Sequence, residues 1–275
     1  FRKTETCNVA ALLVAAAWMY RVQGSGDWGD RMERAFFNAG AAPIARDFKT
    51  MCYYQSPNRL RSDSLPCTLG CPGTDACRFS PLGHPLVLCC VGACNRIIPS
   101  YIIHMWMATR DNGLAATLHG PSEVTALVGA KVPVTVATTT DYPFNENVHM
   151  KISPERDVEF PLYIRVPRWC KQAEIRVNQS RLQAAPDDKG FVKIARTWAR
   201  GDAVKLKFPM APQVVRGFET EYPAENREYF AFEPEIVFQP RRLPYASLNF
   251  GPLLFALPIP DIDPNTPVED AKWQF

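Results

Sequence analysis

Four side chains that commonly bind metal ions occur in two close pairs. Glu5 and Cys7 stand near the start of the chain, and Cys89 and Cys90 are adjacent to each other much later. Thiolates favour a soft or borderline metal, and three sulfurs with one carboxylate oxygen suit zinc in tetrahedral coordination. A thiolate is also a nucleophile. If the fold brings the two pairs together, they indicate a metal site or a nucleophilic site.

A second interpretation of the cysteine pair is inert packing in the core. Free cysteine is among the most buried residue types, and Cys89 and Cys90 end an apolar run at residues 85–90. Their spacing matches no standard Cys-x-x-Cys pattern of a zinc or redox site. From the residues alone, buried core and a metal or nucleophilic site both stay open.

The first pair stands at the start of a predicted helical hairpin. Residues 6–21 carry apolar side chains at three-to-four spacing, which is typical of a helix, and Gly24 and Gly26 are expected to end it. Asp27 can cap a second helix, and the two helices would pack as a hairpin. The apolar face expected on the second helix holds Met32, Ala35, Phe36 and Ala39.

The segment before the cysteine pair lacks any periodic pattern. Residues 47–85 are punctuated by proline and glycine, so we expect a long loop, and such loops in compact domains usually have a function. Cys67, Cys71 and Cys77 in this loop could form a second metal site or a local disulfide. No fourth well-spaced ligand accompanies them, so we assign them no role.

After the cysteine pair the pattern changes from helix to strand. Residues 91–98 suit one or two helical turns, which Pro99 would stop. Residues 101–109 are predicted to form a strand. The Asp-Asn-Gly sequence at residues 111–113 is a strong hairpin signal, because Asn-Gly readily takes positive φ angles. Residues 114–119 would then be the return strand.

The rest of the chain is predicted to be β-structure. Short alternating segments separated by turn residues are typical of an antiparallel sandwich. We therefore expect an α+β chain with helical residues 1–108 and a β-sandwich region at residues 109–275, built as one module or as two with the second incomplete. The predicted strands are residues 132–139, 158–166, 173–177, 191–194, 203–208 and 248–257.

Composition argues against several classes of partner. The 275 residues are 47% hydrophobic, and 31 basic and 28 acidic side chains give a net charge of only +3. This near balance predicts no binding to nucleic acid or to an anionic membrane surface. No apolar run is long enough to predict a spanning helix. Because the chain starts at Phe1, we expect an N-terminally truncated fragment, whose localisation the sequence does not define.

Several motifs, taken in order, resemble a known family. They are Glu5-Thr6-Cys7, the Asp-Arg-Met-Glu-Arg-Ala-Phe-Phe-Asn run at residues 30–38, Cys89-Cys90, Asp-Asn-Gly-Leu at 111–114, His-Gly-Pro-Ser at 119–122, and Gly-Pro-Leu-Leu-Phe-Ala-Leu at 251–257. In order and spacing they resemble glycoside hydrolase family 127, the cysteine β-L-arabinofuranosidases and their relatives. The resemblance spans nearly the whole chain.

The resemblance implies a fold, a metal and a reaction. The family fold is an (α/α)6 barrel of twelve helices followed by β-sandwich modules, so this chain would hold the C-terminal helices of the barrel. Glu5, Cys7, Cys89 and Cys90 would bind Zn²⁺, and Cys89 would also be the nucleophile of a retaining glycosidase that removes L-arabinofuranose-type residues from carbohydrate. The family's acid/base glutamate should lie upstream of Glu5, so the fragment alone is expected to be inactive.

Local geometry is compatible with that ligand set. Side chains two apart in an extended segment point the same way, so Glu5 and Cys7 could converge just before the first helix. Cys89 and Cys90 would stand where a loop enters a helix, whose N-terminus favours thiolates.

A non-catalytic interpretation also stays open. Residues 91–94, Val-Gly-Ala-Cys, follow the cysteine pair where family members often have prolines, and Cys94 is an additional thiol. The alternative is a carbohydrate-binding or structural β-sandwich protein whose cysteines hold a structural zinc. An upstream acid/base carboxylate in the full-length protein would discriminate between the two.

Overall fold

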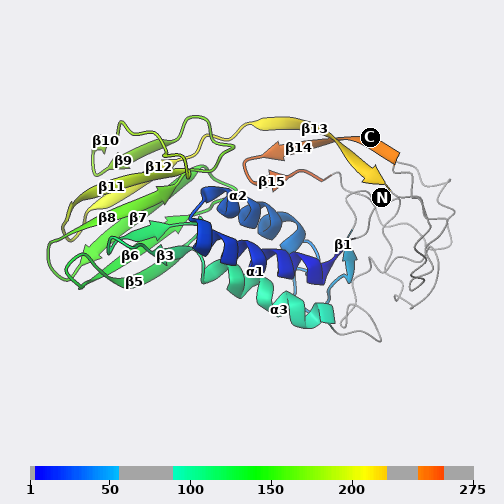
Figure 1. The fold of residues 1–275 in the computed structure, drawn as a ribbon, viewed down its shortest axis with the longest axis horizontal. Helices are drawn as coiled ribbons and strands as arrows, with labels where there is room; N and C mark the ends of the chain where they lie inside the picture. The colour runs from blue at the N-terminus through cyan, green and yellow to red at the C-terminus, as the bar shows by residue number, and fades with distance from the viewer. Residues whose placement is uncertain (1–3, 56–88, 222–240, 257–275) are drawn as a thin grey trace.

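The computed structural model describes residues 4–55, 89–221 and 241–256. In these ranges a group of helices packs against one end of a two-layered β-sandwich, and a separate hairpin-like sheet lies alongside the helices (Figure 1). The helical elements are α1 (Thr6–Gln23), α2 (Gly26–Arg34), a π-helix η1 (Ala35–Gly40) and α3 (Cys89–Ile102). None of the helices described is both long and apolar enough to cross a membrane.

The predicted helical hairpin is confirmed, with changes at its boundaries. Gly24 ends α1 in a left-handed conformation with φ of 63°, and its N–H donates to the Tyr20 carbonyl at 2.7 Å. The cap of α2 is Ser25, whose Oγ accepts from the backbone N–H of Asp27, so Asp27 itself is not the cap. The second helix also does not continue regularly, because it changes to π-helix at Ala35.

The third helix is longer than expected. Pro99 lies inside α3, which continues to Ile102, so the predicted stop is wrong and the predicted strand at residues 101–109 shortens to β3 (Trp106–Ala108). A proline removes one helical N–H and crowds the preceding turn. In α3 this cost is opposed by packing on both sides of Pro99, because Ile97 and Tyr101 are fully or almost fully buried.

Two sheets form the sandwich. The larger has the order β10-β9-β12-β7-β6-β5 and the smaller has the order β11-β8-β4-β3. The Asn-Gly hairpin joins β3 to β4 as predicted, with Asn112 at φ of 55°. The strands are β4 (Leu114–Ala116), β5 (Ser122–Val128), β6 (Val132–Thr140), β7 (Asn147–Pro154), β8 (Val158–Arg165), β9 (Glu174–Val177), β10 (Ser180–Arg181), β11 (Phe191–Trp198) and β12 (Ala203–Lys207).

Two features of the sandwich differ from expectation. Strands β5 and β7 and the two-residue β10 were not predicted, although all three lie within the larger sheet. The sandwich is also not purely antiparallel, because β4 pairs with β8 in parallel, with Leu114 opposite Leu162. The remaining predicted strands are present within a few residues of their expected ends.

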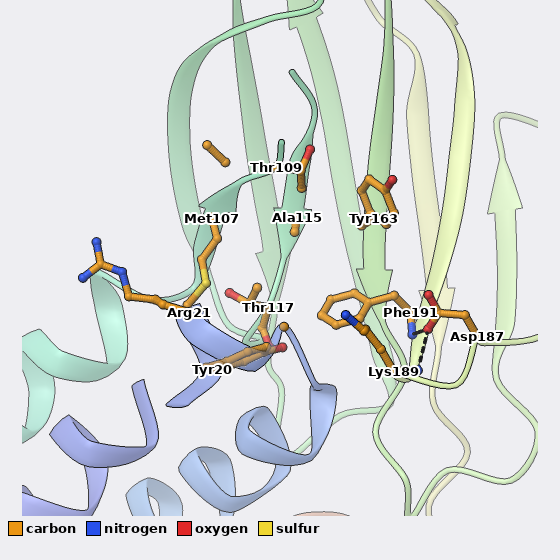
Figure 2. A pocket seen from close by; sticks show the side chains of 12 residues that line it. Tyr20, Arg21, Met107, Thr109, Ala115, Thr117, Tyr163, Asp187, Lys189 and Phe191 are labelled. Carbon is orange, nitrogen blue, oxygen red and sulfur yellow. Dashed lines mark hydrogen bonds between the residues drawn. The ribbon is translucent and has the colours of Figure 1, made fainter. Parts of the chain in front are cut away.

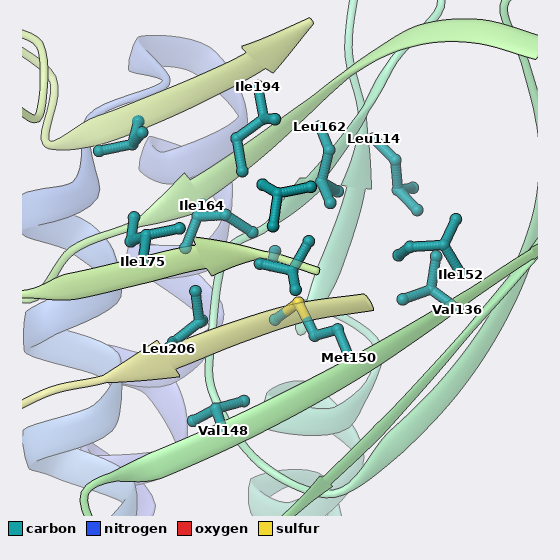
Figure 3. Packing of buried hydrophobic residues seen from close by; sticks show 14 of the residues in the cluster. Leu114, Val136, Val148, Met150, Ile152, Leu162, Ile164, Ile175, Ile194 and Leu206 are labelled. Atoms are coloured by element: carbon teal, nitrogen blue, oxygen red, sulfur yellow. The ribbon is translucent and has the colours of Figure 1, made fainter. Parts of the chain in front are cut away.

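The sandwich core lies between the two sheets. Alternate residues of each strand point inward, as along β7, where Val148, Met150 and Ile152 are all buried (Figure 3). Trp198 closes part of this core, and its indole N–H donates to the Phe160 carbonyl at 3.0 Å, which satisfies the one polar group of the ring.

A third sheet follows the sandwich. It has the order β13-β14-β15, formed by β13 (Pro212–Glu221), β14 (Arg241–Phe250) and β15 (Leu253–Leu254). The single strand predicted at residues 248–257 is therefore two strands that turn at Gly251, with φ of 55°. The domain boundary at residue 108 stays a prediction, as does the (α/α)6 barrel, since the helices described here are far fewer than twelve.

A buried ion-pair cluster joins the helices to the sandwich. Arg165, at the end of β8, is fully buried and pairs with Glu33 and Asp30 of α2. Its Nε also donates to the Thr117 carbonyl at 2.6 Å. Helix α2 can approach this side chain because Gly29 has no Cβ: a methyl group there would lie 2.6 Å from Arg165 Cδ. The glycine is thus required by the close packing of α2 on β8.

The Glu33 carboxylate is surrounded by hydrogen-bond donors. The backbone N–H of His119 donates to Oε1 at 2.9 Å, and the Tyr142 hydroxyl donates to Oε2 at 2.7 Å. Burial alone would raise the pKa of Glu33, but the Arg165 guanidinium, His119 and Tyr142 outweigh it and lower that pKa. Burial and Arg165 lower the pKa of His119 to about 4, so the imidazole is neutral at pH 7.

We expect Glu33→Gln to destabilise the full-length protein by about 3 kcal/mol, because it leaves Arg165 buried without its principal partner. The matched control is Glu159→Gln on the same strand as Arg165, where the side chain is exposed and the effect should stay within about 0.5 kcal/mol. Urea unfolding followed by circular dichroism measures both. Equal midpoints for the two variants would contradict the structural role of the Glu33 pair.

Candidate metal and active site

The packing of α1 beside α3 brings the two ligand pairs together. The helices lie side by side with their first turns at the same end (Figure 1). Glu5 is in β1 (Thr4–Glu5), Cys7 is in the first turn of α1, and Cys89 and Cys90 begin α3. Cys7 is therefore helical and not part of an extended segment with Glu5, but the two side chains still converge.

The four side chains form a compact set of ligands. One ligand atom from each lies within 4.8 Å of all the others. Cys7 Sγ and Cys90 Sγ are 3.2 Å apart, and the thiols of Cys89 and Cys90 donate to Glu5 Oε1 at 3.5 and 3.6 Å. Ligand atoms at zinc bond lengths in a tetrahedral site are about 3–4 Å from one another. The set therefore fits a metal ion with thiolate and carboxylate ligands.

A short segment that follows η1 holds the first pair in position. Strand β1 pairs with β2 (Tyr54–Gln55), with Glu5 opposite Tyr54. The backbone N–H of Thr6 donates to the Tyr53 carbonyl at 2.9 Å, and its hydroxyl donates to the Cys52 carbonyl at 2.9 Å. These bonds satisfy donors at the start of α1, where no side-chain cap is present.

The two adjacent cysteines differ in their exposure to solvent. Cys90 is fully buried and packs with Met51 and Tyr53, whereas Cys89 is exposed. Burial raises the pKa of the Cys7 thiol, and it raises that of Cys90 to about 11. Without a metal both thiols are therefore protonated at neutral pH. A metal ion would have to displace these protons, so its affinity would increase with pH.

Tyr53 is a residue of this site that the sequence analysis missed. Its hydroxyl donates to Glu5 Oε1 at 3.1 Å and lies 3.7 Å from Cys89 Sγ. Nothing in the local sequence distinguishes it from Tyr54, and only the β1–β2 pairing directs it to the ligands. Cys94 lies outside the ligand set, with Sγ 3.8 Å from Met51 Sδ.

The loop cysteines Cys67, Cys71 and Cys77 lie outside the described residues.

Comparison with known families assigns both halves of the chain. Residues 1–102 match the model described as the catalytic domain of GH127 β-L-arabinofuranosidase, and residues 113–210 match the GH127 middle domain. The class is that of the glycoside hydrolases. The chain belongs to glycoside hydrolase family 127, as its motifs predicted. A comparison with curated proteins finds no significant match.

Solved structures show the same fold at low sequence identity. Ara127N-Se, a GH127 β-L-arabinofuranosidase from Geobacillus stearothermophilus T6, is 21% identical with a TM-score of 0.62, over 90% of this chain and 47% of its own. The GH127 β-arabinofuranosidase BT3674 is 18% identical with a TM-score of 0.67, over 92% of this chain and 37% of its own. The chain thus spans less than half the length of either structure.

We expect Tyr53→Phe to weaken zinc binding by the full-length protein about tenfold, because groups that hydrogen-bond to ligands typically contribute 10–100-fold to metal affinity. The ring, which is buried, would be retained. Competition with a chromophoric chelator measures the zinc Kd. Tyr245→Phe on β14 is the control and should leave the Kd unchanged; an unchanged Kd for Tyr53→Phe as well would remove Tyr53 from the site.

Proposed function

We propose that the full-length protein is a retaining glycoside hydrolase that removes L-arabinofuranose-type residues from carbohydrate. Cys89 is the nucleophile, and Glu5, Cys7, Cys89 and Cys90 bind a zinc ion. Family membership supports the reaction class. The observation that carries the residue assignment is the contrast between the exposed Cys89 and the buried Cys90 within one ligand set.

The contrast matters because a nucleophile must reach the anomeric carbon. The sequence leaves the two cysteines equal, and the family's order of the pair favours Cys89. Exposure now supports the same choice on physical grounds. Bound zinc would keep the thiols deprotonated at neutral pH, where burial otherwise keeps Cys7 and Cys90 protonated. The N-termini of α1 and α3, which carry Cys7 and the Cys89–Cys90 pair, add a field of the same sign.

The reaction would proceed in two displacements. Cys89 Sγ attacks the anomeric carbon and forms a thioglycosyl bond, while the leaving oxygen takes a proton from an acid expected in the upstream part of the protein. Water activated by the same group then attacks that carbon, so Cys89 is released and the configuration is retained. Cys7, Cys90 and Glu5 only hold the metal, and Tyr53 orients Glu5.

A structural zinc site in a non-catalytic carbohydrate-binding protein is the alternative. The four ligands would serve it equally well, since closed sites of four protein ligands are typical of structural zinc. The two functions differ in the predicted reactivity of Cys89: in a structural zinc site, Cys89 would form no adduct with a sugar-mimicking electrophile.

We expect Cys7→Ser and Cys90→Ser to lose zinc from the full-length protein, because each removes one thiolate from a four-ligand site. Cys94→Ser is the matched control, since this thiol lies one helical turn beyond Cys90 but outside the ligand set. Metal content per chain, measured by mass spectrometry, should fall well below one in the first two and stay near one in the control. Unchanged zinc in both ligand variants would contradict the assignment.

We expect Cys89→Ser to abolish hydrolysis of an aryl L-arabinofuranoside while the protein stays folded, because the exposed Cys89 side chain adds little to the packed core. A sugar-mimicking electrophile should label Cys89 in the wild-type protein, as mapped by peptide mass spectrometry. Labelling of Cys90 with Cys89 untouched would reverse the roles of the two residues. Labelling of neither, with zinc present, would favour the structural site.

A further inference from the structure

A pocket of about 230 Å³ lies on the outer face of the smaller sheet, at the C-terminal end of α1 (Figure 2). It is lined by residues of α1, β3, β4, β8, β11 and the loop before β11. Arg21 at its edge is fourteen residues along α1 from Cys7, or about 20 Å at the helical rise of 1.5 Å per residue. The pocket is therefore separate from the proposed zinc site.

Strand register explains why the sheet is hollow at this point. Tyr163 on β8 stands opposite Lys193 on β11 and opposite Ala115 on β4, and Ala115 stands opposite Met107 on β3. Side chains directly opposite one another share a face of the sheet. Ala115 therefore leaves a gap between the larger side chains of Tyr163 and Met107, which Figure 2 shows on either side of it.

The Tyr163 ring is held in place by Asp111, from the turn between β3 and β4, and by Lys193 of β11. Its hydroxyl donates to Asp111 Oδ2 at 2.7 Å, and Lys193 Nζ donates to the same oxygen at 3.0 Å. Lys193 Nζ lies 5.3 Å from the centre of the ring. Lys193 and Ala115 flank Tyr163 on opposite sides, so the ring stands as a fixed aromatic wall facing the hollow. Fixed aromatic rings bind at low entropic cost.

The polar groups around the pocket carry both signs of charge. Arg21 and Lys189 are cationic and Asp187 is anionic. The Thr109 hydroxyl is already used, because it donates to Asp111 Oδ1 at 2.6 Å and accepts from the backbone N–H of Gly113 at 3.0 Å. Asp187 Oδ1 already accepts from the backbone N–H groups of Lys189 and Phe191, at 3.0 and 2.8 Å, which fixes the loop. An anionic ligand could pair with Arg21 and Lys189 but would offer Asp187 no donor, and a purely apolar segment would desolvate Lys189 and Asp187 without hydrogen bonds. A neutral ligand with many hydroxyl groups fits both requirements.

We propose that this pocket binds one sugar unit of a neutral glycan, with its apolar face against Tyr163 and its hydroxyl groups toward Lys189 and Asp187. The choice of an arabinose-containing glycan as ligand rests on the proposed function. The site would hold polymeric substrate on the protein at a distance from the reacting bond. It would thus affect binding of the polymer and leave turnover of a small substrate unchanged.

The experiment uses the full-length protein and fills the gap at Ala115 with a larger side chain. Ala115→Leu places a larger side chain between Tyr163 and Met107, and Ala195→Leu on the same face of β11 is the matched control, since Ala195 is exposed and outside the pocket lining. Native gel electrophoresis in gels with and without arabinan measures affinity. Ala115→Leu should weaken the apparent affinity at least about fivefold, in line with the energy of an aromatic contact. Ala195→Leu should match the wild type.

A second variant protects the test against misfolding. Tyr163→Ala removes the aromatic wall and should also weaken retention, and thermal melting identifies any variant that fails to fold. Hydrolysis of an aryl L-arabinofuranoside should be unchanged in Ala115→Leu. If folded Ala115→Leu and Tyr163→Ala are both retained like the wild type, the sugar site is refuted. Retention by polygalacturonate but not by arabinan would refute the neutral ligand.

The two proposals can fail separately. If the wild type hydrolyses the aryl substrate but arabinan retention does not depend on Ala115, the pocket proposal fails and the glycosidase proposal stands. If the wild type has no hydrolase activity but retention still depends on Ala115, the reverse holds.

Discussion

The packing of the helices on the β-sandwich depends on the buried ion pair between Arg165 and Glu33. A guanidinium with no exposed surface is stable only if its charge is compensated. Arg165 achieves this with carboxylates from α2 and the carbonyl of Thr117. These partners come from both sides of the junction, so the helices and the sandwich cannot shift relative to each other without exposing an unpaired charge.

Burial and the charge of Arg165 shift the pKa values of the neighbouring acidic groups and of His119. Burial raises the pKa of Asp30 more than Arg165 lowers it, whereas at Glu33 the favourable contacts outweigh burial. His119 is held neutral, and its Nε2–H can donate to the Arg165 carbonyl at 2.9 Å. Below pH 6.5 the unfolded state takes up a proton that the folded His119 does not accept until about pH 4. The stabilising contribution of neutral His119 is therefore lost as pH falls through that window, at up to about 1.4 kcal/mol per pH unit.

Sequence patterns predicted the parts of this molecule whose signals are local. The three-to-four spacing of apolar residues in α1, the turn at Asn112 and the alternation along the strands are each signals that one segment carries by itself. The continuation of α3 through Pro99 was not predictable, because it depends on what Ile97 and Tyr101 contact far away in the sequence. Strand β7 also alternates, with Val148, Met150 and Ile152 inward, so it carries the same local signal although it was not predicted.

The candidate site likewise has one part that the sequence predicts and one part that depends on tertiary structure. Glu5, Cys7, Cys89 and Cys90 could be proposed because thiolates and carboxylates are common zinc ligands and because the motifs that contain them resemble family 127. Their convergence, however, requires α1 and α3 to lie with their first turns together, which is a tertiary fact. Nothing in the sequence indicates that Tyr53 belongs to the site. Its contact with Glu5 depends on the pairing of β1 with β2, which the sequence does not predict.

Helix α1 gives the two candidate sites a common physical basis. Its first turn carries Cys7 of the candidate ligand set, and the Tyr20 hydroxyl in its last turn donates to the Thr117 carbonyl at 3.1 Å. Thr117 is also the residue that accepts from Arg165 Nε. The end of α1 that borders the pocket is thus anchored to the buried cluster, and its other end is fixed by Thr6 against the segment that carries Tyr53. Because a packed helix is nearly rigid along its axis, the length of α1 sets the separation between the candidate metal ligands and the proposed sugar pocket.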